Sequence, residues 1–351
     1  MKTGMRNDLR LVIAENRMRK AIHSFFDPYR IFLLISIASY IAYWSYITIS
    51  AYYSMNEGIF DLGSFEQGEF SIVRNPSLSL IAIDFFTRPG IFIFFPLGYF
   101  VNYPLILFIQ SFALGIAAYP IYVIAFNNTN SKLFALIISL SYLVYFPLAG
   151  INIFMVHLQA FFIPLFIFGY LALSKEKYKT SFVLILLSGL TKYPYVIIVV
   201  LFSLINILEI LITRKKTTVS RSKYYFYSFL FLTSFLVTLF SYFYLLEFPT
   251  MTTNQIVTRG TSLSGNILTF DKVLVIPLIL LPVAFLPFFS RKFLPMFLPY
   301  AFLVFCTSLS IFQYPSFYTE QYSSLVIPFV YLGAIDGWKT LLSIFEKRAR
   351  L

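Results

Sequence analysis

Long apolar runs constrain the fold of this chain more than any other feature of its sequence. Runs of roughly 18 or more residues recur from Ile31 to the end, and each is long enough to cross the hydrocarbon core of a bilayer. The chain of 351 residues is 59% hydrophobic, whereas soluble domains rarely exceed about half apolar residues. The sequence therefore predicts an all-α, polytopic integral membrane protein.

Charge and leader signals agree with this class. A net charge of +12 would point to nucleic acid in a soluble protein, but here we expect the basic residues to flank membrane spans and expect no nucleic-acid partner. The first apolar run is too long for a signal peptide and has no clear cleavage site. The lone Cys306 excludes an internal disulfide.

About ten spans are predicted. They cover roughly residues 31–53, 102–126, 133–149, 158–174, 179–191, 193–212, 224–246, 274–289, 293–311 and 322–345. The segment GLTKYPY interrupts one apolar run around Lys192. A single tilted span there would place TRKKTTVSRSK outside, against the charge rule, so we prefer two spans, 179–191 and 193–212.

The basic residues predict which side each connection faces. With the N-terminus in the cytoplasm, all but a few of the 27 Lys and Arg lie in cytoplasmic segments, as the positive-inside rule expects. We therefore expect both termini to be cytoplasmic, with a basic segment 1–30, one membrane domain over 31–345 and a tail at 346–351. The exceptions on the outer side are Arg74, Arg88, Lys192, Arg259 and Lys272.

Two outer connections are long, at about residues 54–101 and 247–273. The first contains RPGIFIFFPLGYFVNYP, an apolar stretch that is broken by prolines. Because backbone breaks at membrane depth are buried in protein or line a cavity, we interpret this stretch as interfacial or re-entrant helix. On the inner side, the loop RKKTTVSRSK is expected to contact anionic lipid headgroups.

The stretch GIFDLGSFEQGEF places three carboxylates, Asp61, Glu66 and Glu69, just after the first span. An ionisable residue at membrane depth is costly and therefore indicates function. A carboxylate in a semi-dry outer cavity can act as a general base on an acceptor hydroxyl, and carboxylate oxygens can hold Mg²⁺ or Mn²⁺. The spacing alone leaves open that all three are solvated loop charges.

Cations and one histidine share the outer side. Lys192, Arg88 and Arg259 could bind an anionic group such as a lipid-linked phosphate, with Arg able to bind it bidentately. Ordinary snorkelling and pairing with outer carboxylates is the alternative. His157, at the start of the fourth predicted span, is either a structural hydrogen-bonding group or a ligand.

The last outer turn, IFQYPSFYTEQYSSLVIPF, has the aromatic and amide side chains that suit sugars. The alternative is an aromatic belt at the membrane surface. We assign contact with a sugar or acceptor to Gln67 in the first outer connection and to Tyr318, Gln321 and Tyr322 in this turn.

Four segments together resemble one family. FDLGSFEQGEF is similar to the Asp-Leu-Gly-x-Phe-x-Gln signature of a prokaryotic group of predicted membrane proteins, domain of unknown function twenty-seventy-nine. The segments YPLILFIQSFALGIAAYPIYVIA, NIFMVHLQAFFIPL and QYSSLVIPFVYLGAI resemble later segments of that family in the same order. The resemblance runs from about residue 31 to 345.

That family resembles the C-type membrane glycosyltransferases, the dolichyl-phosphate-mannose mannosyltransferase-like enzymes that use polyprenyl-phosphate sugar donors. SGLTKYPYVIIVV is also similar to a segment of their mannosyltransferase-like members. The resemblance implies a C-type glycosyltransferase-like fold, transfer on the extracytoplasmic face and Asp61 as the catalytic base. Two acids of the family pattern are replaced here, by Gln159 and Tyr193.

On this basis we expect an enzyme that uses membrane lipids and a polyprenyl-phosphate-linked sugar donor, with no organic cofactor. The donor phosphate would be held by Lys192, Arg88 and Arg259, and the metal ligands or supporting groups would be Glu66, Glu69 and His157. The alternatives are a transporter or flippase for a lipid or small anion, and a non-catalytic membrane subunit that keeps the fold. A carrier needs ionisable groups near mid-span, and this sequence has almost none there.

Overall fold

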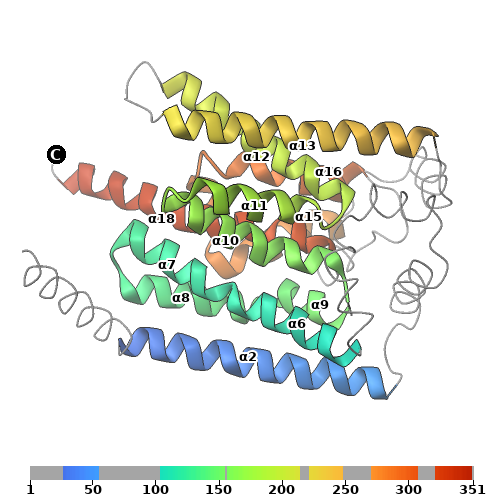
Figure 1. Cartoon of the computed structure of the whole chain (residues 1–351). Coiled ribbons are helices and arrows are strands. Elements are labelled where there is room, and N and C mark those ends of the chain that lie inside the picture. Colours follow the sequence, from blue (N-terminus) through green and yellow to red (C-terminus); the bar gives the residue numbers. More distant parts are fainter. Residues whose placement is uncertain are drawn as a thin grey trace, which may run out of the picture.

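The computed structural model describes residues 27–54, 103–154, 156–213, 221–247, 270–306 and 321–349 (Figure 1). Within these ranges the chain forms α-helices and short 3₁₀-helices and no strand. The all-α prediction is confirmed there. The interfacial or re-entrant helix predicted in the first outer connection lies outside the described residues.

Up to residue 247, the described residues form a series of α-helices with one short 3₁₀-helix. In order they are α2 (Pro28–Tyr53), α6 (Tyr103–Ile116), α7 (Ala118–Thr129), α8 (Lys132–Leu143), α9 (Phe146–Ile153), the 3₁₀-helix η1 (Leu158–Phe161), α10 (Phe162–Ser174), α11 (Tyr178–Gly189), α12 (Tyr193–Thr213) and α13 (Arg221–Glu247).

The last part of the chain is more interrupted. It contains α15 (Phe270–Leu280), η2 (Leu281–Val283), η3 (Leu286–Phe289), η4 (Leu294–Phe297), α16 (Leu298–Cys306), η6 (Gln321–Leu325) and α18 (Ile327–Ala349). Proline lies within the first turn of η2, η3 and η4 and inside α15. Because proline has no backbone N–H and clashes with the turn before it, the prolines that begin η2, η3 and η4 keep the preceding helix from continuing into them.

Five stretches of the described residues are long and apolar enough to cross a membrane. They are Pro28–Tyr53, Tyr103–Thr129, Lys132–Ile153, Tyr195–Thr213 and Arg221–Phe243. Leu158–Ser174, Tyr178–Gly189 and Val273–Val283 are apolar but shorter. Several membrane-length helices are therefore present, and the larger number of ten spans stays a prediction.

The break at Lys192 is a true turn between two helices. α11 ends at Gly189, α12 begins at Tyr193, and a Cβ atom on Gly189 would lie 2.9 Å from Cγ2 of Val199. In one continuous helix these residues would be about 15 Å apart, so the chain folds back on itself. The preference for two helices over one is confirmed.

The bundle has two distinct ends. At the basic end, the Lys132 ammonium lies 2.9 Å from the Asp27 carboxylate, and the Phe134 ring stacks on Trp338 at 5.1 Å. The start of α2, the start of α8 and the later part of α18 therefore meet there (Figure 1, left). At the opposite end, which we call the loop end, α2 finishes and α6 begins, with the Tyr52 and Tyr103 rings 6.5 Å apart.

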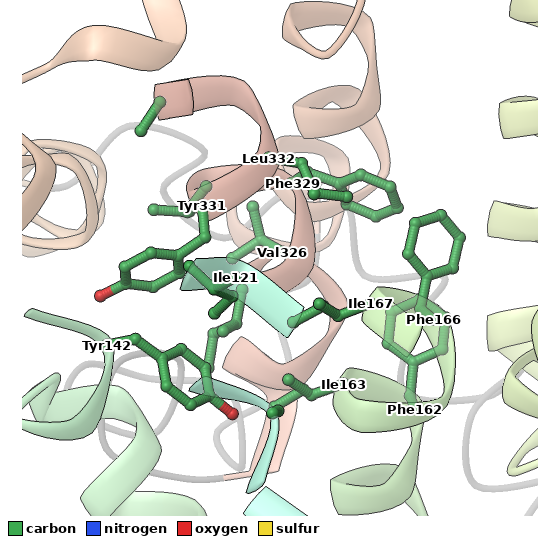
Figure 2. Packing of buried hydrophobic residues seen from close by; sticks show 14 of the residues in the cluster. Ile121, Tyr142, Phe162, Ile163, Phe166, Ile167, Val326, Phe329, Tyr331 and Leu332 are labelled. Carbon is green, nitrogen blue, oxygen red and sulfur yellow. The ribbon is translucent and has the colours of Figure 1, made fainter. Parts of the chain in front are cut away.

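The first turns of helix α18 are buried in the core (Figure 2). The fully buried Tyr331 ring packs edge-on against Tyr142 of α8, at 5.2 Å, and against Tyr145, at 5.5 Å. On another face of α18, Phe329 meets Phe166 of α10 at 4.9 Å. Burial of such large aromatic groups is the main stabilising contribution of the core.

Helices α2 and α13 lie at the outside of the bundle (Figure 1). Both expose large apolar side chains along their outward faces, among them Ile35, Tyr46, Phe229, Phe240 and Phe243. Apolar patches this extensive are rare on proteins surrounded by water. A lipid environment accounts for them.

Candidate functional site at the loop end

The predicted site residues divide into two groups. Outside the described residues lie Asp61, Glu66, Gln67, Glu69, Arg88, Arg259 and Tyr318, and the side chain of Gln321 is not described either. His157, Lys192 and Tyr322 are described, and all three side chains are half-buried. The geometry of the site is therefore built from these three residues and their neighbours.

His157 is held by a buried glutamine. Its backbone N–H donates to Oε1 of Gln110, at 3.0 Å, and Nε2 of Gln110 donates to the carbonyl of Ile151, at 3.3 Å. One side chain of α6 thus ties the end of α9 to the residue before η1. The imidazole ring packs 5.0 Å from the ring of Phe154.

Lys192 and Tyr322 are brought together by a contact between α12 and η6. The Tyr195 and Ser324 hydroxyls form a buried hydrogen bond of 2.6 Å, and the Tyr195 amide donates to the carbonyl of Lys192, at 2.9 Å. Lys192 therefore lies one helical turn from this contact, and Tyr322 lies two residues from it.

The same elements connect this contact to His157. The η6 helix packs on η1 and α9, and the Phe162 ring at the start of α10 lies 4.9 Å from the Tyr195 ring. The turns that carry His157, Lys192 and Tyr322 therefore form one packed unit at the loop end. Their roles in a functional site stay predictions.

A neutral polar network lies beneath this unit. The buried Ser111 hydroxyl donates to Oδ1 of Asn152, at 3.0 Å, and Nδ2 of Asn152 donates to the Tyr40 hydroxyl, at 2.6 Å. Ser111 follows Gln110 in α6, and Gln110 lies about 10 Å along the helix axis from Tyr103 at the loop end. The network is therefore well inside the bundle. Buried amides of this kind are hydrogen-bonded because an unpaired one is costly.

Sequence reasoning did not identify this network, because it searched for ionisable residues. The available signal was an amide inside an apolar run: Gln110 within LILFIQSFALG and Asn152 within FPLAGINIF. Tyr195 and Ser324 carried no such signal, since Tyr and Ser are common throughout this chain.

No cluster of three His, Cys, Asp or Glu that could hold a metal occurs in the described part of the chain. His157 is the one metal candidate within it, and the carboxylates expected beside it lie in 55–102, outside the described residues.

Apolar helices of membrane length, apolar outward faces and neutral polar groups paired inside define a helical membrane protein. A family model described as predicted membrane protein (DUF2079) matches residues 51–351. The chain therefore belongs to this family, as the resemblance of its motifs predicted. No curated protein and no solved structure matches the chain.

Proposed function

We propose that the protein is a membrane glycosyltransferase that moves a sugar from a polyprenyl-phosphate donor to an acceptor at the loop end. The supporting observation is the packed unit formed there by the turns of His157, Lys192 and Tyr322. The connection that carries Asp61 leaves the described helices at Ser54 and returns at Tyr103, also at this end.

In this mechanism the acceptor oxygen attacks the anomeric carbon of the donor sugar. The bond between that carbon and the phosphate oxygen breaks, and polyprenyl phosphate leaves. Asp61 takes the proton of the acceptor hydroxyl as general base. Lys192, with Arg88 and Arg259, stabilises the negative charge that develops on the leaving phosphate.

The remaining predicted residues have supporting roles in the proposal. Gln67, Tyr318, Gln321 and Tyr322 would hold the sugar and the acceptor through hydrogen bonds and ring contacts. Mg²⁺ or Mn²⁺ would neutralise part of the phosphate charge, with oxygen ligands from Glu66 and Glu69 beside His157.

The distribution of basic residues supports an extracytoplasmic loop end. Among the described Lys and Arg, Lys192 lies in the turn between α11 and α12, at the loop end, and Lys272 lies at the start of α15. The others lie at other helix ends, in the turn bound to Asp336, or in α18 beside Trp338, namely Arg30, Lys132, Lys175, Lys177, Lys179, Arg221, Lys223, Arg291, Lys292, Lys339, Lys347 and Arg348. By the positive-inside rule this distribution supports a cytoplasmic basic end, and cytoplasmic termini are part of the proposal.

The same distribution favours an enzyme over a carrier. In the described ranges the Asp, Glu, Lys and Arg residues lie towards the ends of the helices, except Asp336 and Lys339 near the middle of α18. The interior between α6 and α9 holds neutral groups such as Asn152 and Ser111. A transporter or flippase for a lipid or anion would need groups that serve both faces. A non-catalytic subunit would have the same distribution of charges as an enzyme. A sugar-transfer assay separates these two alternatives.

The test is transfer by the purified protein from polyprenyl-phosphate hexoses that carry a tritiated sugar. We expect Asp61→Asn to lower the rate by about 100-fold or more, as loss of a general base does, while the protein elutes as a folded species in size-exclusion chromatography. The matched control is Glu57→Gln, a neutralised carboxylate in the same connection that we expect to leave the rate unchanged. Full transfer by Asp61→Asn, or no transfer by the wild type from any donor of this class, contradicts the proposal.

A further inference from the structure

A cavity of about 140 Å³ lies between the helices on either side of the turn at residues 290–293. It is lined almost wholly by apolar side chains from α15, η3, η4 and α16. These include Ile276, Leu280, Phe288, Leu294, Tyr300 and Ala301. The lining offers no polar partner beyond one tyrosine hydroxyl, so the cavity suits hydrocarbon and not a polar ligand.

An apolar cavity of this size does not fill with water. In another protein an engineered apolar cavity of about 150 Å³ stays dry and binds benzene. Phe288 and Leu294, which line the cavity, are themselves partly exposed on the outside of the bundle. In a bilayer the hydrocarbon available at such a site is a lipid acyl chain.

The turn next to the cavity is fixed to α18 at the basic end. The Ser290 hydroxyl donates to Oδ2 of Asp336, at 2.5 Å, and accepts from the Phe293 amide, at 3.2 Å. Gly337 packs directly on the backbone of Leu286. These contacts hold residues 290–293 in one position relative to the cavity.

Two cations occupy this turn, and Lys292 is engaged within the protein. Burial alone would lower the pKa of its ammonium, but Tyr170, Tyr227, Glu209 and Asp336 raise it above the usual value. The carboxylates among these groups, Glu209 of α12 and Asp336 of α18, favour the charged form of the ammonium. The ammonium also lies 5.4 Å from the centre of the Tyr170 ring.

Arg291 differs from its neighbour because its side chain is exposed. Within the described residues it forms no ion pair and no ring contact. It lies three residues from Phe288 and three from Leu294, the cavity residues on its two sides. The turn therefore presents one uncommitted guanidinium beside an apolar cavity.

We propose that this site binds an anionic phospholipid from the leaflet at the basic end. An acyl chain occupies the cavity, and the lipid phosphate accepts paired hydrogen bonds from the Arg291 guanidinium, whose planar geometry suits phosphate. The site is distinct from the loop end and does not depend on glycosyl transfer.

The experiment is native mass spectrometry of delipidated protein in detergent, titrated with phosphatidylglycerol and, separately, with diacylglycerol of the same acyl chains. We expect Arg291→Gln to weaken phosphatidylglycerol binding about tenfold, the loss of one charge-assisted phosphate contact, and to leave diacylglycerol binding unchanged. Ala301→Phe fills the cavity and is expected to weaken both lipids.

The matched control is Arg221→Gln, which removes an exposed arginine at the start of α13, also at the basic end. It should bind phosphatidylglycerol like the wild type. Equal weakening by Arg221→Gln and Arg291→Gln would show diffuse attraction to surface charge and overturn the proposal. Unchanged phosphatidylglycerol binding by Arg291→Gln would also overturn the proposal. Because Arg291 is exposed, this variant tests the proposal even if Ala301→Phe does not fold.

Discussion

Gly337 on α18 lies against the backbone of η3, and its replacement by alanine tests how tightly this helix holds this part of the chain. A Cβ atom there would overlap the carbonyl oxygen of Leu286 and lie 2.9 Å from its carbonyl carbon. Because these are backbone atoms, no side-chain rotation relieves the clash. Helix α18 and η3 would have to move apart.

Gly333, one turn earlier on the same helix, provides the matched control. A Cβ atom there would lie 3.2 Å from Cβ of Pro287 and 3.3 Å from Cβ of Phe293, a crowding that shifts of a few tenths of an ångström relieve. Both substitutions gain about 1 kcal/mol of helix propensity. This gain is therefore the same in the two variants and cancels when their stabilities are compared. The remaining difference is the backbone clash at position 337, and overpacking of this kind costs about 1–3 kcal/mol.

The measurement is thermal unfolding of the two purified variants in the same detergent, followed by the fluorescence of Trp44 and Trp338 at one heating rate. We expect Gly337→Ala to unfold a few degrees below Gly333→Ala, since 1 kcal/mol corresponds to about 2–4 °C in domains of 150–250 residues. If Gly337→Ala unfolds at the same temperature or higher, the close packing of α18 on η3 is wrong.

Three further substitutions test the loop end. Gln110→Leu removes the side chain that bonds to the His157 N–H and to the Ile151 carbonyl. We therefore expect the unfolding free energy to fall by about 2–4 kcal/mol. Unchanged stability in denaturant titrations would show that Gln110 does not hold His157 in this way. Tyr195→Phe and Ser324→Ala each remove half of one buried hydrogen bond. In a double-mutant cycle we expect a coupling of about 0.5–1.5 kcal/mol, and strictly additive effects would show that the bond contributes nothing.

The sequence alone predicted the class of the protein and several helix limits. Hydropathy identified α2, α12 and α13, and the interruption at GLTKYPY gave the turn at Lys192. These predictions hold because hydropathy and helix-breaking residues act locally along the chain. Motif order also identified the family, which matches residues 51–351.

Local patterns were less informative where proline recurs. Within the predicted spans 274–289 and 293–311, the helices α15 and α16 are separated by the short 3₁₀-helices η2, η3 and η4. Whether a proline bends a helix or ends it depends on which neighbours satisfy the freed backbone groups. In this part of the chain the turn after η3 is held against α18, where the Ser290 hydroxyl donates to Asp336.

The candidate site shows the same division. The sequence identified His157, Lys192 and Tyr322 as residues of interest, and its assignments for Asp61 and the other residues of the outer connections stay predictions. Only the tertiary structure decided that Gln110 holds His157 and that Tyr195 meets Ser324, partners 47 and 129 residues apart in sequence. Composition and periodicity determine which side chains avoid lipid or water, but the packing of helices determines which of them meet.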